Sequence, residues 1–214
     1  VALVSTHDAA SSETPLQLGA TGLRQVVDVT GPAGWQRLRH LMAAPVTRAA
    51  ARIQGPLILA LGEAPADLRF FFEMLVRLAP DITTVRALCR ACEVRPSTLM
   101  SRFSRAGLPS PKSYLASVRL LHAAHLLEAP GRSIADVAYR LEYSSPQSFG
   151  RHVRAMLGIT SLEFRRRFPF PAALARFLEL MIVPYRGVWP VFHPLETGSW
   201  DSGHCLAVQA PPPH

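Results

Sequence analysis

The sequence lacks several features that would indicate particular classes of protein. Its three cysteines are too few for the disulfide framework of a small secreted domain, which favours a reducing, cytoplasmic location. No apolar run approaches the roughly 20 residues that a membrane-spanning helix needs, so no membrane partner is expected. No secretory signal stands at the start, and because Val1 is not an initiator methionine we expect the natural chain to begin further upstream.

Motifs of enzymes are also missing. The chain has no phosphate-binding loop, dinucleotide fingerprint, nucleophile elbow or zinc-protease motif, so we expect neither an enzyme nor a bound cofactor. Cys89 and Cys92 have the C-x-x-C spacing of redox and zinc sites, and His122 and His125 would be neighbours on a helix. No further ligand follows at a suitable spacing. Packing is the favoured interpretation of both pairs, and a thiol- or metal-responsive sensor that uses Cys89 and Cys92 is the alternative.

Positive charge is concentrated in one part of the chain. Residues 81–168 contain 14 arginine and lysine residues against 6 acidic ones, whereas the remainder of the chain is balanced. A basic segment of this kind suits a polyanionic partner, of which nucleic acid is the commonest. The charge distribution therefore predicts a nucleic-acid-binding segment in the middle of the chain.

The same segment contains an internal repeat with an offset of 49 to 51 residues. Its apolar residues recur in two copies, in which Val85, Leu88, Cys92, Val94, Leu99 and Phe103 correspond to Ile134, Val137, Leu141, Tyr143, Phe149 and Val153. Each copy predicts two short helices separated by a four-residue turn, which is the pattern of a helix-turn-helix. Between the copies, residues 111–127 predict one long helix, because they contain no internal glycine or proline.

Capping signals support these helices. Ser133 is followed three residues later by Asp136, which is a capping-box arrangement, and Ser145 stands before a proline at a first helical position. The expected fold class is therefore mainly α, with a tandem helix-turn-helix domain over residues 81–168 whose two units are joined by a long helix.

The flanks are expected to differ from this domain. Residues 1–78 have the pattern of a partial α/β segment that becomes helical, and its role is unknown. Its expected elements are strands at Val1–Val4 and Leu23–Val29, a helix at Trp35–Met42 and helices over Val46–Leu78 broken at Pro56 and Pro65. Residues 169–214 predict one C-terminal helix, Ala172 to Ile182, and a disordered tail over about the last 20 residues.

Residues 81–168 resemble the DNA-binding domain of the AraC/XylS family of bacterial transcription regulators. The second copy, from Ser133 to Thr160, follows the family signature nearly position by position. The resemblance implies two helix-turn-helix units, promoter DNA as the partner and activation through contact with RNA polymerase. The chain departs from the family at three places. Arg95 stands where the family prefers a capping serine, and Ser161 stands where it prefers a proline. Glu142 stands where the family usually has the glycine of the turn between the two helices of the second copy.

The outward residues of the two second helices are candidates for reading bases in the major groove. Gln147 and Arg151 stand four residues apart on one helix face, suit the edges of adenine and guanine, and match base-contacting positions of the family. The expected base-reading set is Gln147, Ser148, Arg151, Ser97, Ser101 and Arg102. The expected phosphate-holding set is Arg105, Lys112, Arg119, Arg154 and Arg165.

The sequence thus predicts a sequence-specific DNA-binding transcription regulator that reads double-stranded DNA with two recognition helices. A non-regulatory DNA-binding module, such as the arm of a recombinase, is a second alternative beside the thiol or metal sensor. The patterns assign no effector, operator or oligomeric state.

Overall fold

The structure is a computed structural model that describes residues 2–5, 25–28 and 47–195, which fall into two units. In the first unit, strand β1 (Ala2–Ser5) pairs in parallel with strand β2 (Gln25–Asp28). Both strands overlap the segments expected to be strands. The helix expected at 35–42 and the tail expected to be disordered lie outside the described residues, apart from Leu195.

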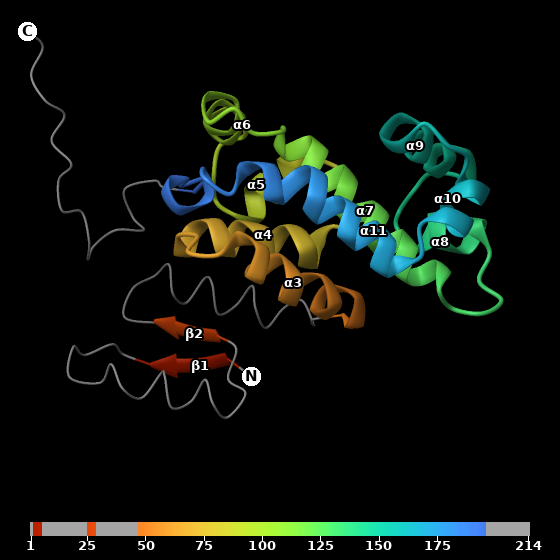
Figure 1. The fold of residues 1–214 in the computed structure, drawn as a ribbon, viewed down its shortest axis with the longest axis horizontal. Helices are drawn as coiled ribbons and strands as arrows, with labels where there is room; N and C mark the ends of the chain where they lie inside the picture. Colours follow the sequence, from red (N-terminus) through yellow and green to blue (C-terminus); the bar gives the residue numbers. More distant parts are fainter. Residues whose placement is uncertain (1, 6–24, 29–46, 196–214) are drawn as a thin grey trace, which may run out of the picture. The chain divides into compact units, whose positions relative to one another are not determined.

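The second unit is helical over residues 47–195, so the mainly α fold class is confirmed (Figure 1). Its α-helices are α3 (Arg48–Leu61), α4 (Ala66–Leu78), α5 (Val85–Ala91), α6 (Pro96–Arg105), α7 (Pro111–Leu127), α8 (Ile134–Arg140), α9 (Pro146–Leu157), α10 (Ser161–Arg167) and α11 (Phe170–Phe177). After α11 the chain continues through a π-helix, η2 (Leu178–Ile182), and two 3₁₀ turns, η3 (Val183–Tyr185) and η4 (Trp189–Val191).

Local capping signals fix where most of these helices begin. The expected capping box is present at α8, where Ser133 and Asp136 bond reciprocally, and Thr160 and Glu163 form another at α10. The bonds to the cap residues lower the pKa values of both carboxyl groups. Arg95, in contrast, caps α6 without a side-chain hydrogen bond, which is the structural cost of replacing the usual serine.

One expected helix break is wrong. Pro65 stands just before α4, as expected, but α3 continues through Pro56. A proline inside a helix forfeits one backbone hydrogen bond and crowds the preceding turn. Burial of Ile53, Leu57 and Leu61 along one face of α3 offsets this cost.

Helix α7 is the centre of the helical unit. It is buried on nearly every side, with Tyr114, Val118 and Ala123 fully enclosed. In Figure 1, α6 and α9 lie at the same edge of the unit, towards opposite ends of α7, while α3 and α4 lie at the opposite edge. A helix with apolar residues around most of its circumference lies in a core, and here α7 supports two helix pairs, α5–α6 and α8–α9.

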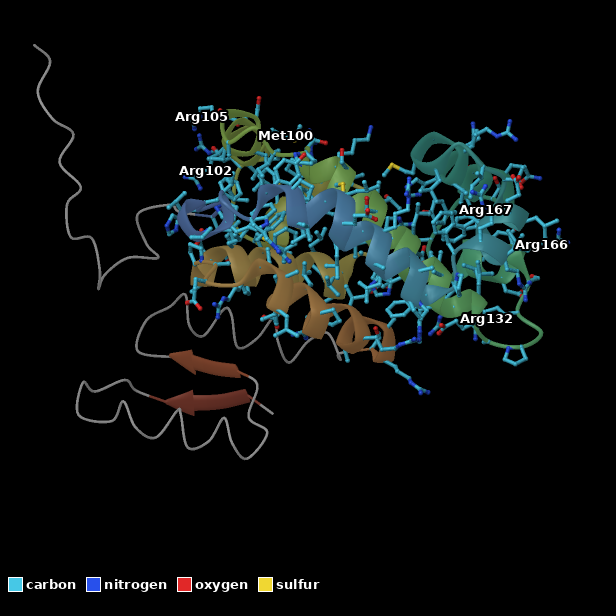
Figure 2. All side chains as sticks on the ribbon, in the orientation of Figure 1. Met100, Arg102, Arg105, Arg132, Arg166 and Arg167 are labelled. Atoms are coloured by element: carbon cyan, nitrogen blue, oxygen red, sulfur yellow. The ribbon has the colours of Figure 1, made fainter. Side chains whose placement is uncertain are left out.

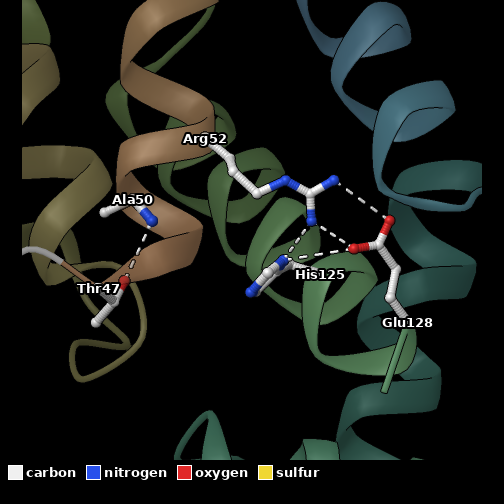
Figure 3. Close-up of polar contacts among 5 residues, drawn as sticks. All are labelled: Thr47, Ala50, Arg52, His125 and Glu128. Atoms are coloured by element: carbon white, nitrogen blue, oxygen red, sulfur yellow. Dashed lines mark hydrogen bonds and ion pairs between the residues drawn. The ribbon is translucent and has the colours of Figure 1, made fainter. Parts of the chain in front are cut away.

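A polar cluster ties α3 to the C-terminal end of α7. Arg52 of α3 donates hydrogen bonds to Glu128 and, at 2.8 Å, to Nδ1 of His125 (Figure 3). The bond from Arg52 lowers the pKa of Glu128. The same guanidinium lies 4.0 Å from the centre of the Phe170 ring, which begins α11. The cluster is partly exposed, so each ion pair contributes about 1 kcal/mol or less to stability.

The segment after α11 completes the core around α4, α6 and α7. Trp189 is fully buried, and its Nε1 donates to the carbonyl of Ile182 at 2.8 Å. The ring of Phe192 lies 4.9 Å from that of Phe103 on α6. The backbone amide of Leu195 donates to the buried Asp67 of α4 at 3.2 Å. The core of the first helix pair therefore includes residues well beyond position 168.

The described residues contain no single helix long and apolar enough to cross a membrane. The segments Ser161–Arg167 and Phe170–Tyr185 are together long and apolar enough, but they form a bent pair with an angle of 94° between its parts.

Candidate nucleic-acid interface

Two helix pairs, α5–α6 and α8–α9, have equivalent turns. The first helix of each pair ends in the same hydrogen-bonded motif, in which Val94 N–H donates to Cys89 C=O and Tyr143 N–H donates to Ala138 C=O, each at 3.0 Å. The motif places Glu93 and Glu142 in left-handed conformation, with φ of 55° and 57°. This is the position where helix C-termini favour glycine. The departure expected at Glu142 is present, and Glu93 is an equivalent departure that sequence analysis missed.

Replacing Glu142 by glycine is expected to leave the protein equally stable or to stabilise it by up to about 1 kcal/mol, since glycine relieves the left-handed strain at some cost in chain entropy. Urea denaturation measures this difference. Glu179→Gly is the matched control, because Glu179 lies in the right-handed η2 helix, where the same change should destabilise by roughly 0.5–1 kcal/mol. A clear loss of stability in Glu142→Gly would show that this turn is built differently.

Helix α9 presents long polar side chains to solvent. Phe149 and Val153 are fully buried, whereas Gln147, Arg151 and Arg154 are exposed. The sequence predicted the buried and the exposed face of α9 correctly, because two apolar residues four positions apart determine which side of a helix turns towards the core.

Ser148 has internal partners. Its backbone N–H donates to the Ser145 cap at 3.1 Å, and its hydroxyl accepts from Nη2 of Arg151 at 3.0 Å. The hydroxyl also bonds to Ser144 and Ser145. Ser148 therefore orients the Arg151 guanidinium, and it would have to exchange these bonds to reach a base edge itself.

His152 is the residue of α9 that sequence analysis overlooked. Its Nδ1 lies 2.5 Å from the hydroxyl of Tyr143, and its Nε2 is buried without a hydrogen-bond partner in the described part of the chain. Burial, and then the nearby charge of Arg119, lowers the pKa of His152 to about 4. The side chain is therefore neutral near pH 7 and adds no positive charge to the surface of α9.

Helix α6 presents a different surface. Ser97, Ser101 and Met100 are exposed, and they correspond in the repeat to Gln147, Arg151 and Gly150. Arg102 corresponds to the half-buried His152, and its Nη1 donates to the carbonyl of Pro194 at 2.9 Å. Arg102 is one of the expected base-reading residues, and its guanidinium would have to exchange this bond to the C-terminal segment in order to reach a base edge.

Arg119 requires a correction. It was expected to hold a phosphate, but only 4% of it is exposed on the central helix α7. Its guanidinium donates to the carbonyls of Ala79 (2.7 Å), Ile82 (2.5 Å) and Leu141, and lies 4.6 Å from the centre of the Tyr143 ring. Since its donors are used inside the protein, Arg119 is a core residue.

The other cations expected at phosphates lie on the surface. Arg105, Lys112, Arg154 and Arg165 are all exposed. Arg166 and Arg167 are exposed next to Arg165 at the end of α10, and sequence analysis did not single them out. Figure 2 shows Arg102 and Arg105 at one end of the helical unit, and Arg132, Arg166 and Arg167 at the other. Positive side chains are therefore available beside both helix pairs.

The cysteine pair of the alternative hypothesis is enclosed. Cys89 and Cys92 are both buried as free thiols. Burial raises the pKa of Cys89, and burial together with Cys89 raises the pKa of Cys92 to about 12. Thiols in such surroundings are poor nucleophiles and metal ligands. No group of three or more His, Cys, Asp and Glu side chains suited to a metal ion occurs among the described residues.

Comparison with known proteins assigns the class of this region. Residues 88–167 match a protein family described as a helix-turn-helix domain, and the resemblance of this segment to AraC-type DNA-binding domains is confirmed. The lactose operon transcription activator of Staphylococcus xylosus is 28% identical to the chain over 85 residues. The alignment covers 40% of this chain and 30% of that relative, so the chain spans less than a third of the relative's length. No solved structure matches the chain.

Proposed function

We propose that the protein is a sequence-specific transcription regulator in which α5–α6 and α8–α9 are two helix-turn-helix units that place α6 and α9 in the major groove. The helix-turn-helix match over residues 88–167 supports DNA binding and transcription regulation. The equivalent turns and the common edge on which α6 and α9 lie support the use of both pairs (Figure 1). Promoter DNA is the partner, and contact with RNA polymerase is the further step that the family resemblance implies.

The exposed face of α9 carries this proposal. Gln147 and Arg151 project from a helix whose opposite face is anchored by Phe149 and Val153, so both side chains are available to base edges. Glutamine suits adenine and arginine suits guanine. The short side chains of Ser97 and Ser101 give α6 a smaller part in base reading. Arg105, Lys112, Arg154 and Arg165 are assigned to phosphates, where they set the register of the protein.

The test compares two arginines on an operator selected from random DNA and on a scrambled duplex. Arg151→Ala should weaken binding to the operator by about 1–3 kcal/mol and relax the preference at one base pair, because a bidentate contact to guanine is lost. Affinities of the full chain are measured on both duplexes at several salt concentrations.

Arg165→Ala is the matched variant, because Arg165 lies beyond the recognition helix and reaches only the backbone of the DNA. It should weaken binding to both duplexes about equally and reduce the magnitude of the log–log salt slope by about one. If Arg151→Ala weakened both duplexes alike, Arg151 would hold a phosphate and the assignment of base reading would be wrong. Absence of binding to any duplex at low salt would overturn the proposed function.

A further inference from the structure

An apolar cavity lies between the second helix pair and the C-terminal helices. It has a volume of about 150 Å³ and is bounded by α7, the C-terminal end of α9, α10, α11 and η2. Phe164 and Met181 are among the apolar side chains that line it, and Met156 and Leu180 line it while remaining 36% and 49% exposed. Apolar side chains left at the surface around a cavity are typical of a binding site.

The walls of this cavity have two features beyond their apolar character. Leu180 and Met181 belong to η2, a five-residue π-helix, and π-helical turns are rare and frequent at functional sites. Met156 and Met181 come from different elements, α9 and η2, and methionine side chains adapt to ligands of differing shape. These features favour a ligand site over a packing defect.

Two polar side chains, Ser117 of α7 and Arg176 of α11, complete the lining. Arg176 is exposed and makes no hydrogen bond or ion pair within the described part of the chain. Its guanidinium is therefore available to an acid at the edge of the cavity. Arginine binds carboxylates through two parallel hydrogen bonds. A ligand whose acid group stays at this edge keeps contact with water and avoids the cost of burying a charge.

We infer that this cavity binds a small carboxylic acid whose apolar body is about the size of a benzene ring, with Arg176 holding the carboxylate. An apolar protein cavity of about 150 Å³ accommodates benzene, which sets the size of the body. Ser117 offers a hydroxyl as a second polar contact.

Titration calorimetry of the full chain tests this inference with two probes of the same shape. Cyclohexanecarboxylate has the required ring and charge, and cyclohexylmethanol has the same ring without the charge. The acid should bind at least about tenfold more tightly than the alcohol, because only the acid pairs with Arg176. Arg176→Gln should remove this difference, because it should lower the affinity for the acid and leave the affinity for the alcohol unchanged.

Arg186→Gln is the matched control, since Arg186 is an exposed arginine of the same C-terminal stretch that does not line the cavity. It should bind the acid as the parent protein does. Ser117→Leu, which fills the cavity from α7, should abolish binding of both probes, with circular dichroism verifying that each variant is folded.

The inference is overturned if neither probe binds at 10 mM, roughly the weakest useful affinity. It is also overturned if acid and alcohol bind equally tightly to the parent protein, or if Arg176→Gln and Arg186→Gln change the affinity for the acid by the same factor. Binding to a Ser117→Leu variant with parental affinity would place the ligand elsewhere and overturn it too. The titration contains no DNA, so its failure would leave the proposed function untouched.

Discussion

Replacing Trp189 by alanine is expected to lower the free energy of unfolding by about 3–5 kcal/mol, the usual cost of removing a large buried aromatic side chain. The indole is fully enclosed, and its ring centre lies 5.9 Å from those of Phe72 and Tyr185. It also satisfies the carbonyl of Ile182. Alanine would leave a cavity between the C-terminal segment and α4. Thermal and urea denaturation of the full chain measure the loss.

Two variants serve as controls for this change. Trp189→Phe keeps most of the apolar contact and loses the hydrogen bond to Ile182, so its cost should be smaller than that of alanine. Val191→Ala, two residues further on, alters a side chain of a residue that is 75% exposed and should change stability by less than about 0.5 kcal/mol. Equal effects of Trp189→Ala and Val191→Ala would show that the segment is not packed as described.

Replacing Arg119 by methionine is expected to cost about 3–4 kcal/mol of stability. The change leaves the carbonyls of Ala79, Ile82 and Leu141 without their donor, and each buried acceptor left unsatisfied costs about 1–3 kcal/mol. The substitution also removes the buried positive charge of Arg119, and the desolvation cost that this avoids offsets part of the cost of the three unsatisfied carbonyls. The expected loss of stability is therefore smaller than the summed cost of three unsatisfied buried carbonyls.

Urea denaturation of matched variants checks this expectation. Arg119→Lys retains the charge but lacks the planar fork that spans three acceptors, so its loss should be intermediate. Arg165→Met removes an exposed arginine of the same region and should change stability by less than about 0.5 kcal/mol. A loss below about 1 kcal/mol in Arg119→Met would mean that water replaces the guanidinium at these carbonyls.

Sequence alone predicted the parts of this structure that depend on neighbours in the chain. The start of α8 follows from Ser133 and Asp136, and the buried face of α9 follows from the spacing of Phe149 and Val153, because capping and helix periodicity act over a few residues. These local signals are enough to locate α9 and to assign Gln147 and Arg151 to its outer face.

Residues whose surroundings come from distant segments were harder to predict. Arg102 reaches the carbonyl of Pro194, and Phe103 reaches Phe192, only when the C-terminal segment folds back onto the first helix pair. No local pattern encodes these contacts. Arg119 did carry a signal, since most of the residues around it in α7, such as Leu115, Val118 and Leu121, are apolar and do not keep to one face of the helix. A helix of that kind is enclosed, and a single arginine within it is then a core residue.

The position of Arg119 also bears on how the domain opens. One side chain on α7 bonds the carbonyl that follows α4, the carbonyl of the loop before α5, and the carbonyl that ends α8. Loosening either helix pair takes acceptors away from the same guanidinium that anchors the other pair. The two pairs are therefore expected to belong to one cooperative unit, whose most protected amides exchange with solvent together.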